Sequence, residues 1–249
     1  TNEAGSVTSD AAVLTVDANT PLTFLVEGNS VTVTDCEESA SGELVIPSSY
    51  NGKPVTSIGE NAFIDCSSLT SVTIPDSVTA ISRRAFRDCR KLVSVTIPEG
   101  VSSIGEGAFS GCRNLTSLTI PDSVTSIESA AFIDCESLTS VTLGNRIKSI
   151  GARSFESCSS LTSVTIPDSV TSIGEYAFQA SGLTSVTIPD SVTSIGRGAF
   201  VSCSAMESVL IPDSVTSIGD GAFGHCSSLT SIEVVEGNSE YTSQDGILF

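Results

Sequence analysis

The sequence predicts a mostly β solenoid, and two observations carry that prediction. A dipeptide, Ala-Phe or once Ser-Phe, recurs at intervals of 23 residues, with one interval of 22. The consensus of the copies also opens with the pattern L-x-x-V-x-I-P, as in Leu69-x-x-Val72-x-Ile74. Periods of 20–29 residues that begin L-x-x-L-x-L are typical of leucine-rich repeats. The predicted fold class is therefore a leucine-rich-repeat solenoid of about eight 23-residue coils, aligned on Phe63, Phe86, Phe109, Phe132, Phe155, Phe178, Phe200 and Phe223.

One such coil cannot fold alone. Its buried apolar side chains contribute roughly 10–20 kcal/mol, whereas ordering 23 residues costs on the order of 35 kcal/mol. Stacked coils share a core and backbone ladders, so equivalent residues are expected to lie directly over one another.

The N-terminal part is expected to precede and cap this stack. Residues 1–16, TNEAGSVTSDAAVLTV, resemble the last hairpin of an immunoglobulin-like domain, and a disordered leader is the alternative. Residues 17–21 are interpreted as a linker. Two alternating runs around Gly28-Asn29 predict a β-hairpin, which caps the first irregular coil within residues 22–53.

Residues 54–235 are predicted to be the regular coils. In each coil, VTIP alternates apolar and polar residues and predicts a short strand that ends at the proline. A second brief strand is predicted at VTSI, and the A-F-x-x-C segment is predicted to form a short helical turn. Residues 236–249, EGNSEYTSQDGILF, break the consensus and are expected to start a truncated variant repeat of a longer protein.

The consensus LTSVTIPDSVTSIGxxAFxxC resembles the BspA-like leucine-rich repeats of bacterial surface and secreted proteins. The resemblance covers roughly residues 42–235. It implies an extracellular location, secreted or attached to the cell surface, with the signal and anchor outside these residues. It also implies adhesion or protein recognition.

The composition of the chain limits the classes of partner that it could bind. The chain carries 29 acidic and 11 basic residues, a formal charge of −18, which disfavours nucleic acid and anionic membrane surfaces. No apolar run approaches the ~18 residues of a membrane span, so no membrane insertion is expected. With a single histidine, His225, and no phosphate-binding loop or metal-ligand cluster, no enzyme activity and no cofactor are predicted.

Seven cysteines share one slot of the repeat: Cys66, Cys89, Cys112, Cys135, Cys158, Cys203 and Cys226. Stacked slots lie ~4.8 Å apart, which is wider than the ~3.8 Å between the Cβ atoms of a disulfide. Buried free thiols are therefore expected. Cys36 lies outside this ladder, and the sequence predicts no role for it.

A row of mostly acidic residues follows the proline slot. Carboxylates at ~5 Å spacing could hold Ca²⁺, or the aspartate of P-D-S could close an Asx-type turn. The acidic ladder comprises Asp76, Glu99, Asp122, Asp168, Asp190 and Asp213, with Asn145 in the fourth position.

Basic residues gather in one region, which we call the basic patch: Arg83, Arg84, Arg87, Arg90, Lys91 and Arg113. Arg83 shares its slot with Glu60 and Glu106, and Arg197 lies likewise between Glu175 and Asp220, so cross-coil ion pairs are predicted. The rest of the patch is either a solvated surface or a docking site for an acidic partner.

Two functions follow. The first is a non-enzymatic, monomeric recognition or adhesion module that binds a protein or a glycan through the solenoid surface. The alternative is a structural spacer within a large multidomain surface protein, which the nearly uniform Ser and Thr of the strand faces favour, because binding hot spots prefer Tyr, Trp and Arg.

Overall fold

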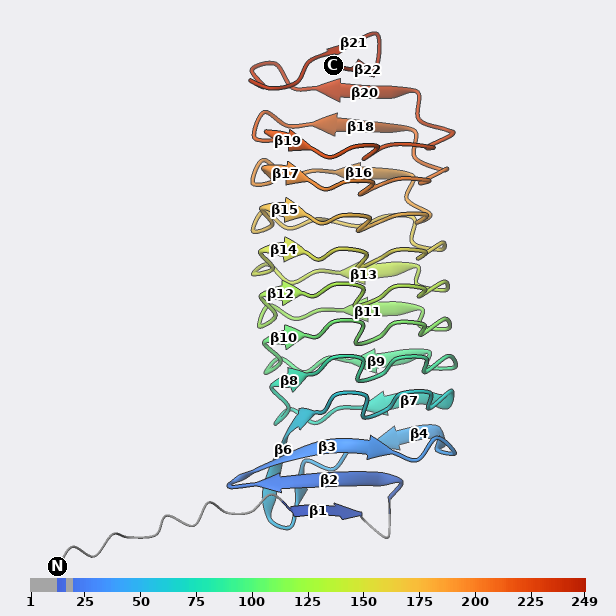
Figure 1. Cartoon of the computed structure of the whole chain (residues 1–249), viewed down its shortest axis with the longest axis vertical. Coiled ribbons are helices and arrows are strands. Elements are labelled where there is room, and N and C mark those ends of the chain that lie inside the picture. Colours follow the sequence, from blue (N-terminus) through green and yellow to red (C-terminus); the bar gives the residue numbers. More distant parts are fainter. Residues whose placement is uncertain (1–12, 17–19) are drawn as a thin grey trace, which may run out of the picture.

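The computed structural model describes residues 13–16 and 20–249, and it shows a stack of coils with residues 13–16 and the C-terminal residues at opposite ends of the stack (Figure 1). Most strands are two to six residues long, as expected where the chain turns several times in each coil. Within the described residues, no helix is long and apolar enough to cross a bilayer.

The N-terminal cap is an antiparallel hairpin, as predicted. Strands β2 (Leu22–Glu27) and β3 (Ser30–Cys36) pair around Gly28, whose φ of 54° suits a tight turn. Strand β3 then pairs in parallel with β6 (Lys53–Ile58), which joins the cap to the first coil. Strand β5 (Ser49–Tyr50) pairs with the start of β6, and the Tyr50 ring stacks on Phe24 with 4.3 Å between centroids.

The predicted immunoglobulin-like remnant is not supported. Residues 1–12 and 17–19 lie outside the described residues. Strand β1 (Val13–Val16) pairs antiparallel with β2 and is the outermost strand of the sheet that continues through the solenoid. Residues 13–16 therefore extend the cap. The proposed linker, residues 17–21, ends in contact with the cap, because the carbonyl of Pro21 accepts the Glu37 amide at 2.8 Å.

The first sheet is a parallel ladder made by the predicted VTSI strands. Each strand contributes one isoleucine that pairs in register with the isoleucine of the next coil, such as Ile58, Ile81 and Ile104. After β6 the ladder comprises β8 (Ala80–Ile81), β10 (Ser103–Ile104), β12 (Ser126–Ile127), β14 (Ser149–Ile150), β15 (Ser172–Ile173), β17 (Ser194–Ile195) and β19 (Ser217–Ile218).

The second sheet is made by the VTIP segments and their variants. The central residue of each three-residue strand, Val95 in Ser94–Thr96 and Leu118 in Ser117–Thr119, points inward while the flanking Ser and Thr face solvent. It forms three blocks: β4 (Ser41–Val45), β7 (Ser68–Thr73) and β9 (Ser94–Thr96); β11 (Ser117–Thr119) and β13 (Ser140–Thr142); β16 (Ser185–Thr187), β18 (Ser208–Ile211) and β20 (Ser231–Val234). Between β13 and β16, the repeat that contains Val164 contributes a single bridge, Thr165 to Thr187. The column of arrows in Figure 1 has a gap at this level.

The predicted helical turns at A-F-x-x-C are wrong. In every coil, two residues four positions apart have positive φ, as at Asn61 (58°) and Asp65 (58°). Left-handed residues at this spacing prevent an α-helix. They also let the chain bond to the next coil, since the Phe63 amide donates to the carbonyl of Ala85 at 2.7 Å. Each coil therefore closes with hydrogen-bonded turns instead of a helix.

The core confirms that equivalent residues stack. From Phe63 to Phe223 the eight phenylalanine rings form one continuous column, with neighbouring centroids 4.7–5.5 Å apart and nearly parallel planes. These distances are typical of offset aromatic stacking. The shorter repeat does not interrupt the column, because Phe178 and Phe200 are 5.3 Å apart.

The C-terminal residues fold back on the last coil. Strands β21 (Ser243–Gln244) and β22 (Ile247–Leu248) form a small antiparallel pair. The hydroxyl of Tyr241 accepts the Ile218 amide at 2.8 Å, which ties this segment to the end of the first sheet.

Candidate functional site

Arg83 lies at the centre of a cross-coil ion-pair ladder, as the sequence predicts. Its two guanidinium nitrogens lie 3.1 Å from Glu60 Oε1 and 3.4 Å from Glu106 Oε1, and all three side chains are largely exposed. Exposed pairs of this kind stabilise a protein by about 0–1 kcal/mol. Arg83 therefore contributes little positive charge to the surface.

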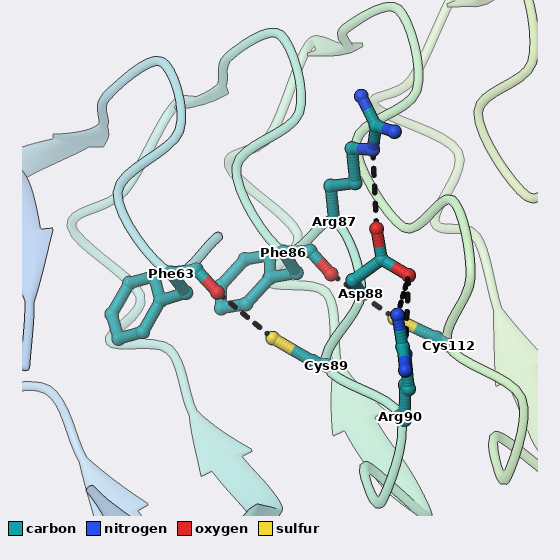
Figure 2. A network of polar contacts seen from close by, with 7 residues as sticks. All are labelled: Phe63, Phe86, Arg87, Asp88, Cys89, Arg90 and Cys112. Atoms are coloured by element: carbon teal, nitrogen blue, oxygen red, sulfur yellow. Dashed lines mark hydrogen bonds and ion pairs between the residues drawn. The ribbon is translucent and has the colours of Figure 1, made fainter. Parts of the chain in front are cut away.

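Most of the remaining basic patch is also paired. Figure 2 shows Asp88 between two cations, with Oδ2 lying 3.3 Å from Arg87 Nε and Oδ1 lying 3.3 Å from Arg90 Nη2. Arg113 lies 3.1 Å from Glu136. Among the described residues only Arg84 and Lys91 of the patch lack an ion pair. An acidic partner would have to compete with four local carboxylates for four of the six cations. The docking role of the patch stays a prediction.

The second predicted ion-pair ladder is wrong. Arg197 makes no ion pair with Glu175 or Asp220 in the described chain. Its guanidinium carbon lies 5.9 Å from the centre of the Tyr176 ring, and that of Arg153 lies 5.1 Å from the same centre. Both distances fall within the range of cation–π attraction. Tyr176 is thus shared by two arginines.

The cysteine ladder consists of free thiols, as predicted, and all of them are buried except Cys226, which is partly exposed. From Cys89 onward, each thiol donates to the carbonyl of the phenylalanine in the preceding coil, for example Cys89 to Phe63 at 3.1 Å and Cys112 to Phe86 at 3.2 Å (Figure 2). Burial raises the pKa of Cys158 to about 12 and that of Cys203 to about 11. Cys158 and Cys203 are therefore protonated at neutral pH, which makes them poor nucleophiles and poor metal ligands.

The cysteines at the two ends of the ladder differ in the carbonyl that accepts their thiol. Cys66 donates to the carbonyl of Cys36 at 3.6 Å, so Cys36 heads the ladder from the end of β3. A hydrogen bond with Cys66 and burial both raise the pKa of Cys36. At the other end, the thiol of Cys226 donates to Phe200 O at 3.1 Å, while its neighbour His225 is exposed.

The acidic ladder is exposed along its whole length. The expected Asx-type turn is not what closes P-D-S. The Val78 amide donates to Pro75 O at 3.0 Å, and the hydroxyl of Ser77 donates to Val55 O in the preceding coil at 2.7 Å. In the part of the chain that the structure describes, no three His, Cys, Asp or Glu side chains gather in an arrangement that could hold a metal ion.

The sequence did not predict a groove that lies over the gap in the second sheet. It has a volume of about 550 Å³ and spans four successive coils. Its wall contains Leu210, which is 51% exposed, and Val235, which is 36% exposed. Asp168 and Asp190 of the acidic ladder lie on its lining.

Two departures from the consensus signal this groove. Leu210 occupies the outward slot that holds threonine in the preceding repeats, and it pairs with Thr187 in the sheet. Val235 occupies the slot of the proline. Sequence reasoning missed them because it treated these outward slots as uniform.

The comparisons with known proteins agree with this architecture. The family profile described as "BspA type Leucine rich repeat region" matches residues 56–182 and 148–244, with six copies. Together these ranges extend over more than half of the chain.

Several solved structures are similar. A leucine-rich cell surface protein from Faecalibacterium prausnitzii A2-165 is 33% identical over 90% of this chain and 77% of its own, with a TM-score of 0.72. A leucine-rich repeat protein from Bacteroides ovatus ATCC 8483 is 27% identical over 88% of this chain and 70% of its own, with a TM-score of 0.60. The leucine-rich repeat protein of T. pallidum is also 27% identical, over 86% and 90%, with a TM-score of 0.60. The comparison with curated proteins gives no match.

Proposed function

The chain belongs to the BspA-type leucine-rich repeat family, and from this premise we propose that it is a non-enzymatic, extracellular recognition or adhesion module that binds a protein through the groove over the second sheet. The similar protein from F. prausnitzii is described as a cell surface protein, which supports a secreted or surface-attached location.

The observation that carries the proposal is the exposed Leu210. Leu210 is half exposed in a column of threonines, and its outward side does not stabilise the fold. Protein partners, in contrast, commonly bury an apolar side chain at the centre of a contact with a polar rim. The hollow around Leu210 supplies such a centre, and exposed Ser and Thr of the neighbouring strands supply the rim.

The experiment compares two matched variants. The immobilised chain is tested against a panel of purified matrix and cell-surface proteins, as wild type, as Leu210→Glu and as Thr119→Glu. Both changes place a carboxylate in the same outward slot, but Thr119 lies outside this groove. We expect at least one protein to bind, and Leu210→Glu alone to weaken it about tenfold or more, because a carboxylate would be buried in an apolar contact. Absence of binding across the panel, or equal loss in both variants, would count against the proposal.

The spacer remains the second candidate, and the ion pairs of the basic patch favour it. Arg83, Arg87, Arg90 and Arg113 have carboxylate neighbours, which leaves Arg84 and Lys91 as the patch cations available to an acidic partner. If Leu210→Glu and the charge reversals Arg84→Glu and Lys91→Glu all leave every interaction unchanged, the spacer is the better description.

A further inference from the structure

We propose that this groove binds a short extended segment of a basic protein, in which an apolar side chain is flanked by lysine or arginine. The inference rests on the proposed function and adds the chemical class of the partner. It follows from three properties of the groove: its apolar wall, its acidic rim and the residue types that its lining lacks.

The apolar part is a single small hollow. Leu210 and Val235 belong to successive coils and are the large exposed hydrophobic residues of the lining. An apolar patch of this size accepts one or two side chains of a partner, in the manner of a pocket for an anchor residue. The hollow lies along the outside of strands β16 and β18, where an extended segment can lie.

The rim of the hollow is acidic and is not neutralised. Asp168 and Asp190 lie on the lining, and Glu233 pairs with Leu210 in the sheet. No lysine or arginine of the described chain forms an ion pair with any of these carboxylates. This differs from the basic patch, where four carboxylates, Glu60, Asp88, Glu106 and Glu136, pair with four of the six cations. A net charge of −18 adds a long-range attraction for cationic partners.

Other partner classes fit the groove less well. The lining contains no aromatic ring on which a sugar could stack, although aromatic side chains are the usual apolar surface for flat ligands. Anionic glycans, acidic proteins and nucleic acids would face uncompensated carboxylates. A cationic segment with an apolar anchor satisfies both features at once.

The experiment measures fluorescence anisotropy of a labelled lysine-rich peptide with a central leucine. Two counterparts carry glutamine or glutamate in place of every lysine. Each peptide is titrated with the full chain as wild type, as Asp168→Asn with Asp190→Asn, and as Leu210→Thr. The matched control is Asp76→Asn with Glu99→Gln, which removes the same charge from the same ladder in distant coils. Unchanged thermal unfolding shows that each variant is folded.

We expect the lysine peptide to bind more tightly than both counterparts. Loss of the two groove carboxylates should weaken it roughly two- to thirtyfold, as expected for two partly exposed ion pairs, and the weakening should disappear at high salt. Leu210→Thr should also weaken binding, and the control pair should not. An equal effect of the control pair would show general attraction to the acidic face and would overturn the proposal.

The remaining outcomes separate the two proposals. If all three peptides bind equally and only Leu210→Thr weakens them, the basic partner is wrong while the groove keeps its recognition role. If none binds, the peptide class is wrong, and the protein panel with Leu210→Glu decides the proposed function independently.

Discussion

The replacement of Ala130 by glycine should stabilise the protein. Ala130 has a φ of 56°, in the left-handed region, and it is the first of the two left-handed positions in its coil. Glycine occupies the same slot at Gly107, Gly198 and Gly221, where φ is 57–63°. The solenoid therefore uses a residue with a side chain at a position where its own repeats often use glycine.

The magnitude follows from two opposing terms. An L-residue in the left-handed region costs roughly 1–2 kcal/mol, and glycine loses about 0.5–1 kcal/mol more conformational freedom on folding. The net gain for Ala130→Gly is about 0.5–1 kcal/mol. The reverse change, Gly107→Ala, should cost about the same, because its new Cβ would lie at ordinary contact distance, 3.5 Å from Arg84 Cγ. The free-energy cost of Gly107→Ala then comes mainly from backbone strain at positive φ.

Thermal and urea unfolding measure both changes. For a chain of this size, 1 kcal/mol shifts Tm by roughly 2–4 °C, so the two variants should move in opposite directions by up to that amount. The control is Ala131→Gly, one residue later, where the buried alanine has no positive φ; it should lose about 1–2 kcal/mol. The reasoning is refuted if Ala130→Gly destabilises the chain as much as Ala131→Gly.

Three further predictions concern the core and the surface. Phe132→Ala removes a ring that is stacked on both sides, and it should lower the free energy of unfolding in urea by about 3–5 kcal/mol. The control Phe249→Ala, at a residue that is 66% exposed, should change it by less than about 0.5 kcal/mol. Similar losses in the two variants would contradict the stacked core. Burial raises the pKa of Cys203 to about 11. The buried protonated thiol therefore contributes its full stabilisation below pH ~9, and the free energy of unfolding falls by about 1.4 kcal/mol per pH unit from there up to about pH 11. Urea midpoints measured at pH 8 and pH 10 should differ more for the wild type than for Cys203→Ser. Arg83→Ala should lower the urea midpoint only slightly at low salt and leave it unchanged at high salt, because its ion pairs are exposed and screened. A large loss that persists at high salt would contradict this reasoning.

The ladders and the phenylalanine column could be predicted from the sequence because they depend only on equivalent residues lying over one another. A fixed period places Phe63 over Phe86 whatever the local backbone does. The conformation of A-F-x-x-C could not be predicted in this way, since it depends on hydrogen bonds between coils. A signal was present nevertheless: Asn61 and Asp65, like the glycines that replace them elsewhere, tolerate left-handed geometry.

The surface was less predictable, for a different reason. Sequence slots identified Glu60 and Glu106 as partners of Arg83, because these side chains occupy one position in neighbouring coils. They gave no indication that Asp88 pairs with Arg87 and Arg90, because that contact depends on how one turn folds within a single coil. The groove was missed because it needs the gap in the second sheet and outward residues from four coils together.

The repeat itself separates residues that the fold needs from residues that it does not need. Where the chain departs from its consensus at an inward slot, the structure supplies an internal hydrogen bond: Ser154 donates to Gly151 O at 2.6 Å, and Ser181, in the slot of the missing cysteine, lies 3.2 Å from Cys203 Sγ. Leu210 is a departure of another kind, because half of its surface faces water and a threonine would satisfy the same strand position. Its exposed surface has no contact within the described solenoid that would explain a leucine there, and this is the observation on which the proposed recognition role rests.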